Sequence, residues 1–193
     1  MGISNAAIFL PINGSQLAPS VTTSDRYKHW NSTKDLRRCV DCENNHGKIW
    51  SIEETPNPTP PIHPNCRCLI EVMKAIAAGT ATLNGMDGAD WTLLYEGILP
   101  DYYIAWDDIK KLGWDLGKWP SNFAPGKMIT RGNYKNKNGH LPQSPGRVWH
   151  EADINYTSGK RNSQRVLWSN DGLIFVTYDH YETFYEIIQG DSK

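Results

Sequence analysis

Short strand-like runs rich in hydrophobic residues fill the last third of the chain, and turn residues separate the runs. The pattern predicts strands at residues 127–129, 147–155, 165–169, 173–178 and 183–188. Between the third and fourth runs, Ser169-Asn170-Asp171-Gly172 predicts a hairpin turn, because Asp-Gly tolerates the positive φ that such turns require.

Helical patterns precede these strands. We expect helices at residues 89–95 and 105–112, and a short helix at 69–78. The second begins with Asp107 and Asp108, where a helix N-terminus favours negative charge, and Gly113 ends it. Helices followed by a run of strands predict an α+β fold in which helices pack on a twisted antiparallel sheet.

The chain divides by composition into three parts. Residues 1–78 form an N-terminal annex that holds all four cysteines and a proline-rich stretch between the two cysteine pairs. Residues 79–88 (GTATLNGMDG) predict a flexible linker, and residues 89–193 a second domain.

Charge and hydropathy narrow the possible partners. The net charge is only -1, but residues 110–165 hold eleven basic and three acidic side chains, a formal +8 that would attract a phosphate backbone. The same excess is also consistent with an ordinary lysine-rich surface. No apolar run approaches the roughly 20 residues that cross a bilayer, and the first 20 residues lack the pattern of a standard signal peptide.

A group of titratable residues lies in the strand-rich part. Strand alternation places Trp149, Glu151 and Asp153 on one face of their strand, and Ala152 and Ile154 on the other. A strand carboxylate, two arginines (Arg161 and Arg165) and a later His180 are the groups that metal-free RNA cleavage needs. Taken singly, a strand glutamate near arginines is more often a surface ion pair, and a lone histidine is more often structural.

The amino-acid sequence of this region resembles a known protein family. Residues 149–165 (WHEADINYTSGKRNSQR) and 177–184 (TYDHYETF) resemble the barnase-like microbial ribonucleases, as do Leu99-Pro100-Asp101, Leu112-Gly113-Trp114, Ala124-Pro125-Gly126-Lys127 and Gly139-His140-Leu141-Pro142. The resemblance covers residues 89–188. It implies a metal-independent endoribonuclease that cuts single-stranded RNA 3′ to guanosine through a 2′,3′-cyclic phosphate.

The resemblance also implies roles for individual residues. Glu151 would be the general base and His180 the general acid. Arg161 and Arg165 would bind the phosphate, Asp153 would support the arginines, and Tyr181 would line the site.

Two positions depart from the family pattern. Trp106 stands where the family has a lysine near the reacting phosphate, and Lys110 or Lys111 is poorly placed to replace it. The loop Lys135-Asn136-Lys137-Asn138 has Asn138 where the family has a glutamate that accepts two hydrogen bonds from guanine. Because an amide has a single acceptor oxygen, we expect a weaker guanine preference, carried mainly by the backbone of Asn136 and Lys137.

The cysteines of the annex predict a metal clip. Cys39, Cys42, Cys66 and Cys68, with His46 and His63 nearby, are typical of a structural zinc site, although disulfides between the two pairs or free thiols remain open. Cys39-Val40-Asp41-Cys42, His46-Gly47-Lys48 and residues 61–68 (PIHPNCRC) also resemble the C-terminal part of phage minor head (head morphogenesis) proteins.

Two functional hypotheses follow from the sequence. The first is an exported or delivered ribonuclease toxin whose partners are single-stranded RNA and an acidic inhibitor of the barstar kind, with no membrane partner. The second is a phage-derived structural or RNA-binding protein in which catalysis has weakened, a reading that Trp106 and Asn138 motivate.

Overall fold

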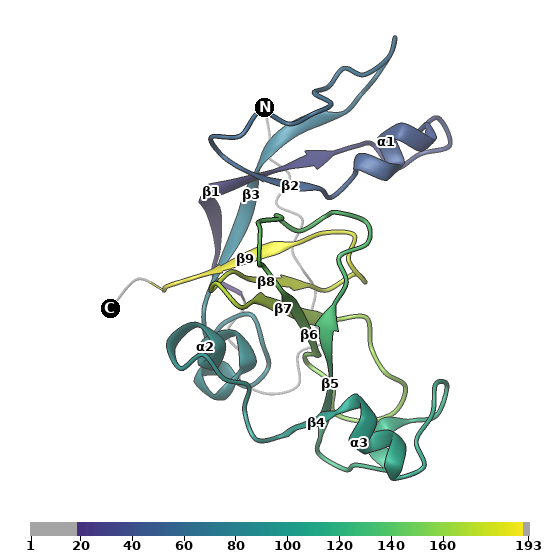
Figure 1. Cartoon of the computed structure of the whole chain (residues 1–193), viewed down its shortest axis with the longest axis vertical. Helices are drawn as coiled ribbons and strands as arrows, with labels where there is room; N and C mark the ends of the chain where they lie inside the picture. Colours follow the sequence, from purple (N-terminus) through teal and green to yellow (C-terminus); the bar gives the residue numbers. More distant parts are fainter. Residues whose placement is uncertain (1–18, 191–193) are drawn as a thin grey trace.

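The computed structural model describes residues 19–190 (Figure 1). The expectation about a signal peptide falls on the first 20 residues, nearly all of which lie outside this range. Its strands form one nine-stranded sheet in the order β2-β1-β3-β9-β8-β7-β6-β5-β4. The strands are β1 (Val21–Asn31), β2 (Ile49–Ser51), β3 (Leu69–Ala77), β4 (Tyr103–Ala105), β5 (Met128–Tyr134), β6 (Trp149–Asp153), β7 (Arg165–Ser169), β8 (Ile174–Thr177) and β9 (Tyr185–Ile188).

The helices are short. They are α1 (Val40–Asn45), α2 (Ala89–Tyr95) and α3 (Trp106–Lys111), with single 3₁₀ turns η1 (Gly85–Asp87) and η2 (Pro120–Asn122). The helices α2 and α3 lie where the sequence predicts them, and the α+β fold is confirmed. Within residues 19–190, no helix has the length and apolar character needed to cross a membrane.

The five predicted strands of the second half are all present as β5 to β9. Strands β5 to β9 pair antiparallel in sequence order, and the predicted turn at 169–172 closes the β7–β8 hairpin with Gly172 at φ +90°. The sheet has two parallel pairs, β3 with β9 and β4 with β5.

The predicted helix at residues 69–78 is wrong, because this segment is strand β3. It pairs with β1 along one edge and with β9 along the other, so backbone pairing on both sides outweighs its local helical pattern. Strands β1, β2 and β4 were not expected either, because their apolar positions are too few or too irregular to show a period of two.

Hydrophobic cores cover both faces of the central strands. On one face, Ala152 and Ile154 pack with Val166, Val176 and Leu93 of α2. On the opposite face, Trp149 packs with Leu167 and Phe175, and with Tyr27, Ile49 and Met73 of the annex. The face that carries Glu151 and Asp153 is therefore covered, so these carboxylates lie inside the protein and not on an open surface.

The annex is joined to the rest of the sheet through β9. Glu186 of β9 is fully buried, and its carboxylate accepts hydrogen bonds from the side chains of Ser24 and Arg26 of β1. Since a buried carboxylate needs a partner, this contact fixes β1 and β3 beside β9.

The segment 79–88, which the sequence predicts as a linker, contains η1. The buried carboxylate of Asp90 accepts hydrogen bonds from the backbone of Gly79 (2.7 Å) and Ala81 (3.0 Å) and from the Thr82 hydroxyl (2.7 Å). The division of the chain into units at this segment remains a prediction.

Candidate active site

Two carboxylates of β6 form the base of the candidate site. Glu151 pairs across the sheet with Leu167, and Asp153 pairs with Arg165 at the first position of β7. Only 4% of Glu151 and none of Asp153 is exposed. Burying two negative charges so close together is unfavourable unless cations lie beside them.

Two guanidinium groups supply that compensation. Arg161 donates from Nε to both oxygens of Asp153 (2.9 and 2.8 Å) and from Nη2 to Oδ1 (2.5 Å). Arg165, itself only 2% exposed, places Nε 3.2 Å from Asp153 Oδ1. Asp153 therefore holds both arginines in place, as the resemblance implies.

Glu151 lies against the same two arginines but is bonded less tightly. Its Oε1 is 3.6 Å from Arg161 Nη2 and 3.7 Å from Arg165 Nε. Within the described residues, Glu151 Oε1 and Arg165 Nε are buried and make no hydrogen bond. Buried side-chain atoms without partners are uncommon in folded proteins, and a catalytic role is one of the explanations for them. Here an acceptor and a donor of this kind face each other in one cluster.

The loop between β8 and β9 brings Tyr181 to this carboxylate. Burial, and after it the negative charge of Glu151, raises the pKa of Tyr181 above its ordinary value. Its ring stacks on Tyr134 of β5 with 5.5 Å between the ring centroids.

His180 directly precedes Tyr181 and is exposed, with 4.8 Å between the two rings. Both residues have positive φ, +62° for His180 and +73° for Tyr181. Two successive non-glycine residues in this region carry backbone strain, which commonly accompanies functional loops. The structure thus gathers Glu151, Asp153, Arg161, Arg165 and Tyr181 in one cluster. It places His180 next to Tyr181 on the loop between β8 and β9.

A cation that the sequence analysis missed lies at Trp106. The β5–β6 pairing shifts register between Thr130 and Gly132, so that Arg131 is an extra residue opposite Glu151 and Ala152. The guanidinium of Arg131 lies 4.3 Å from the ring centroid of Trp106, and that of Arg161 lies 5.7 Å from it. Lys111, considered as a substitute cation, instead pairs with Asp108 at 2.8 Å.

The predicted base-recognition loop follows β5. Asn136 is buried, with φ +40°, and its side chain donates to the carbonyl of Leu141 (2.8 Å) and accepts from its amide (3.1 Å). Asn136 therefore closes the loop, whereas Lys135, Lys137 and Asn138 are exposed.

A cavity of about 540 Å³ lies between this loop and the annex. Lys137, Asn138 and Tyr181 line one side, and the annex contributes Arg38, His46 and Lys48. The cavity is large enough for a nucleotide. Glu43 and Glu182 also line it, so Arg38, Lys48 and Lys137 leave only a small excess of positive charge to favour a negatively charged occupant.

Among residues 19–190, the groups of side chains close enough to hold a metal ion lie in the annex, and none of them includes Glu151. Cys39, Cys42 and His63 form one close group, and Cys42, Cys66 and Cys68 form another. All four cysteines are free.

Comparison with known proteins gives two matches along the chain. Residues 98–188 match the ribonuclease family, and residues 15–71 match the family described as Phage Mu protein F like protein. A ribonuclease of Heyndrickxia coagulans is 46% identical over 109 residues, which are 55% of this chain and 99% of that protein. A ribonuclease of Bacillus intermedius is also 46% identical over 109 residues, covering 67% of its length.

These matches confirm both resemblances that the sequence predicts, and the ribonuclease match includes every residue from β6 to the end of β9. Through its second half, the chain belongs to the ribonuclease family.

Proposed function

We propose that this ribonuclease cleaves single-stranded RNA without a metal, by transferring the phosphate to the neighbouring 2′-hydroxyl. The observation that carries the proposal is the buried Oε1 of Glu151, which lies between two guanidiniums and has no hydrogen-bond partner within the described residues. An acceptor oxygen held in this way can take a proton from a substrate hydroxyl.

The proposed reaction needs one proton acceptor and one proton donor. Glu151 removes the proton of the 2′-hydroxyl as O2′ forms its bond to phosphorus. The P–O5′ bond breaks, and protonated His180 gives its proton to the departing O5′. The products are a 2′,3′-cyclic phosphate and a free 5′-hydroxyl, with the transferred proton on Glu151 and neutral His180.

Arg161 and Arg165 would stabilise the charge that builds on the phosphate. Asp153 engages Nε and Nη2 of Arg161, so Nη1 is the nitrogen left for a phosphate oxygen. Arg165 Nε is the buried donor without a bond. A guanidinium suits this role because it stays charged and can bond two oxygens at once.

Substitution of the two proton-transfer groups tests the mechanism. We expect Glu151→Gln and His180→Ala each to lower kcat about 10²- to 10⁴-fold, because each removes one proton transfer. The measurement is cleavage of a guanosine-containing dinucleotide in EDTA, with cyclic phosphate as the product. Matched controls are Glu71→Gln, an exposed glutamate on β3, and His150→Ala, whose ring stacks on Trp168.

Full activity in both variants, or cleavage that requires an added divalent metal, would contradict the mechanism. RNA binding by the intact chain without any turnover would instead support the alternative, a catalytically weakened RNA-binding or structural protein of phage origin.

Arg131 provides the third cation in this proposal. Its place on the bulge beside Glu151, stacked on Trp106, puts a guanidinium on the side of the site where the family has a lysine. We expect Arg131→Ala to lower kcat/KM roughly 10-fold or more through loss of one charged donor. The control is Lys74→Ala, which removes an exposed cation of β3. Equal effects of the two substitutions would show that Arg131 acts only through overall charge.

Base preference is proposed to depend on the loop that ends in Asn138. Asn138 lines the cavity beside Lys137, so a carboxylate at this position could accept two hydrogen bonds from guanine. We expect Asn138→Glu to raise the ratio of kcat/KM for guanosine over adenosine dinucleotides about 10-fold, the effect of one paired hydrogen-bond contact. The control is Asn133→Glu, at an exposed position of β5, which should leave the ratio unchanged. If the ratio does not rise in Asn138→Glu, the guanine base does not bind at residue 138.

An acidic inhibitor and an exported or delivered mode of action complete the proposal. A ribonuclease active in its own cell would be harmful, and the cationic 110–165 segment offers a surface for an acidic protein of the barstar kind. The annex, similar to Phage Mu protein F like protein, supports delivery on a phage-derived carrier. Affinity capture from the native host should recover an acidic protein that blocks cleavage. Recovery of none, with the chain found only inside the producing cells, would oppose this part.

A further inference from the structure

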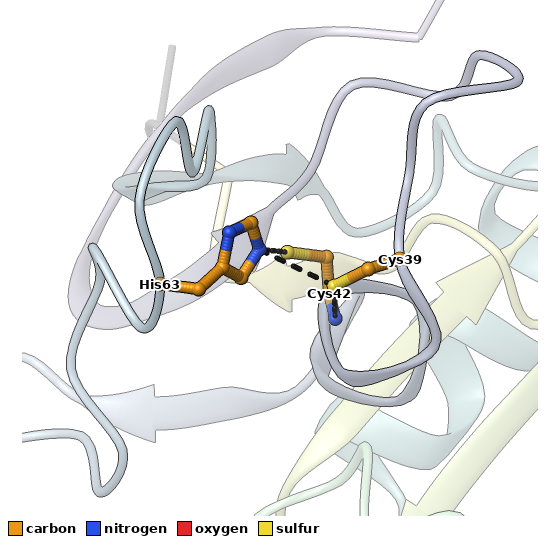
Figure 2. Close-up of side chains that lie close together, drawn as sticks. All are labelled: Cys39, Cys42 and His63. Atoms are coloured by element: carbon orange, nitrogen blue, oxygen red, sulfur yellow. Dashed lines mark hydrogen bonds between the residues drawn. The ribbon is translucent and has the colours of Figure 1, made fainter.

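Five metal-binding side chains converge in the annex, far from β6 in the sequence. Cys39 caps the N-terminus of α1, and Cys42 lies in its first turn. His63, Cys66 and Cys68 come from the loop before β3. Figure 2 shows His63 pointing between the sulfurs of Cys39 and Cys42.

The five donors form two close groups that share Cys42: Cys39, Cys42 and His63 in one, and Cys42, Cys66 and Cys68 in the other. The distances within the first group, and from Cys42 to Cys66, match the edges of one metal site. His63 Nε2 is 3.3 Å from Cys39 Sγ and 3.2 Å from Cys42 Sγ, and Cys42 Sγ is 3.9 Å from Cys66 Sγ. In a tetrahedral zinc site the metal bonds imply separations of about 3.5 Å between nitrogen and sulfur and about 3.8 Å between two sulfurs. The observed edges agree with these values to within a few tenths of an ångström.

The orientation of His63 also fits a metal ligand. Its Nδ1 lies 2.8 Å from the carbonyl oxygen of Pro64, which can accept a hydrogen bond only from a protonated Nδ1. The lone pair is then on Nε2, the atom that faces the two sulfurs. Zinc-bound histidines usually have such an outer hydrogen bond, because it fixes both the tautomer and the ring plane.

The surrounding core is too small to hold these segments by itself. Its buried members are Trp30, Cys42 and Cys68, with half-buried Trp50, Ile62 and Ile70 at the edge. Segments with so little apolar burial usually need a metal or disulfides to stay folded. Here all four cysteines are free, which favours the metal.

We propose that Cys39, Cys42, His63 and Cys66 bind one structural zinc ion. Cys66 and Cys68 form one close group with Cys42, and we assign the fourth position to Cys66 because its sulfur lies 3.9 Å from that of Cys42 and is the less buried of the two. Cys68 packs in the small core with Trp30. Four protein ligands leave no position for water, so the ion stabilises the annex and takes no part in RNA cleavage. The ligand set differs from the four cysteines predicted from sequence by exchanging Cys68 for His63.

Metal content of the purified full chain tests the site without reference to ribonuclease activity. We expect one zinc per chain by elemental analysis, and four free thiols when the protein is unfolded in chelator. After exchange for cobalt(II), visible bands of a tetrahedral site and charge transfer from three thiolates should appear. Substoichiometric zinc in protein purified without chelator, or two disulfides, would overturn the proposal.

Single substitutions test the ligand assignment. His63→Ala and Cys66→Ser should reduce the bound zinc from one per chain to near zero, whereas Cys68→Ser and His46→Ala should keep it. Loss of zinc in Cys68→Ser with retention in His63→Ala would overturn the assignment in favour of four cysteines. If a variant does not fold, the cobalt spectrum of the unaltered chain still separates three thiolates and one imidazole from four thiolates by its charge-transfer intensity.

Discussion

The candidate site depends on the burial of two carboxylates on one strand. Glu151 and Asp153 lie two residues apart on β6 and face the same side, so neither can be charged inside the protein without a cation beside it. Arg165, opposite Asp153 on β7, and Arg161, in the preceding loop, meet this requirement. Asp153 receives the shorter contacts, and Glu151 is left with a buried oxygen that a substrate can engage.

The elements around this cluster divide into a rigid sheet and two unusual backbone segments. Paired strands fix the carboxylates and Arg165, whereas residues 180–181 in positive-φ conformations bring His180 and Tyr181 to the site. The bulge at Arg131 directs a further guanidinium toward Trp106. Strain and irregular pairing therefore occur where the proposed chemistry takes place, and regular structure supports them.

Sequence patterns predicted the second half of the fold well because its strands are short apolar runs and the turns between them contain characteristic residues, as at Gly172. They failed at residues 69–78, where pairing with β1 and β9 decides the conformation and no local pattern records it. For the same reason the position of Arg131 was missed, since a bulge depends on the register of two strands. It could have been found only by knowing which residues of β5 and β6 face one another, because the pairing of these strands places Arg131 on a bulge.

In the annex, the spacing of the cysteines along the sequence also predicts only part of the site. The two cysteine pairs indicated a metal clip, but the choice among five donors depends on how the loop before β3 folds back on α1. The hydrogen bond between His63 and Pro64, which orients the imidazole, is a property of that folded loop.

In the proposed reaction, Glu151 takes a proton from the substrate and His180 gives one to it. The pH dependence of kcat/KM measures this most directly. We expect a bell-shaped profile that rises with pH as the carboxyl group loses its proton and falls as the imidazole loses its own, with the alkaline fall absent in His180→Ala. A profile that rises steadily to high pH in the unaltered chain, as expected for attack by a metal-bound or free hydroxide, would contradict it.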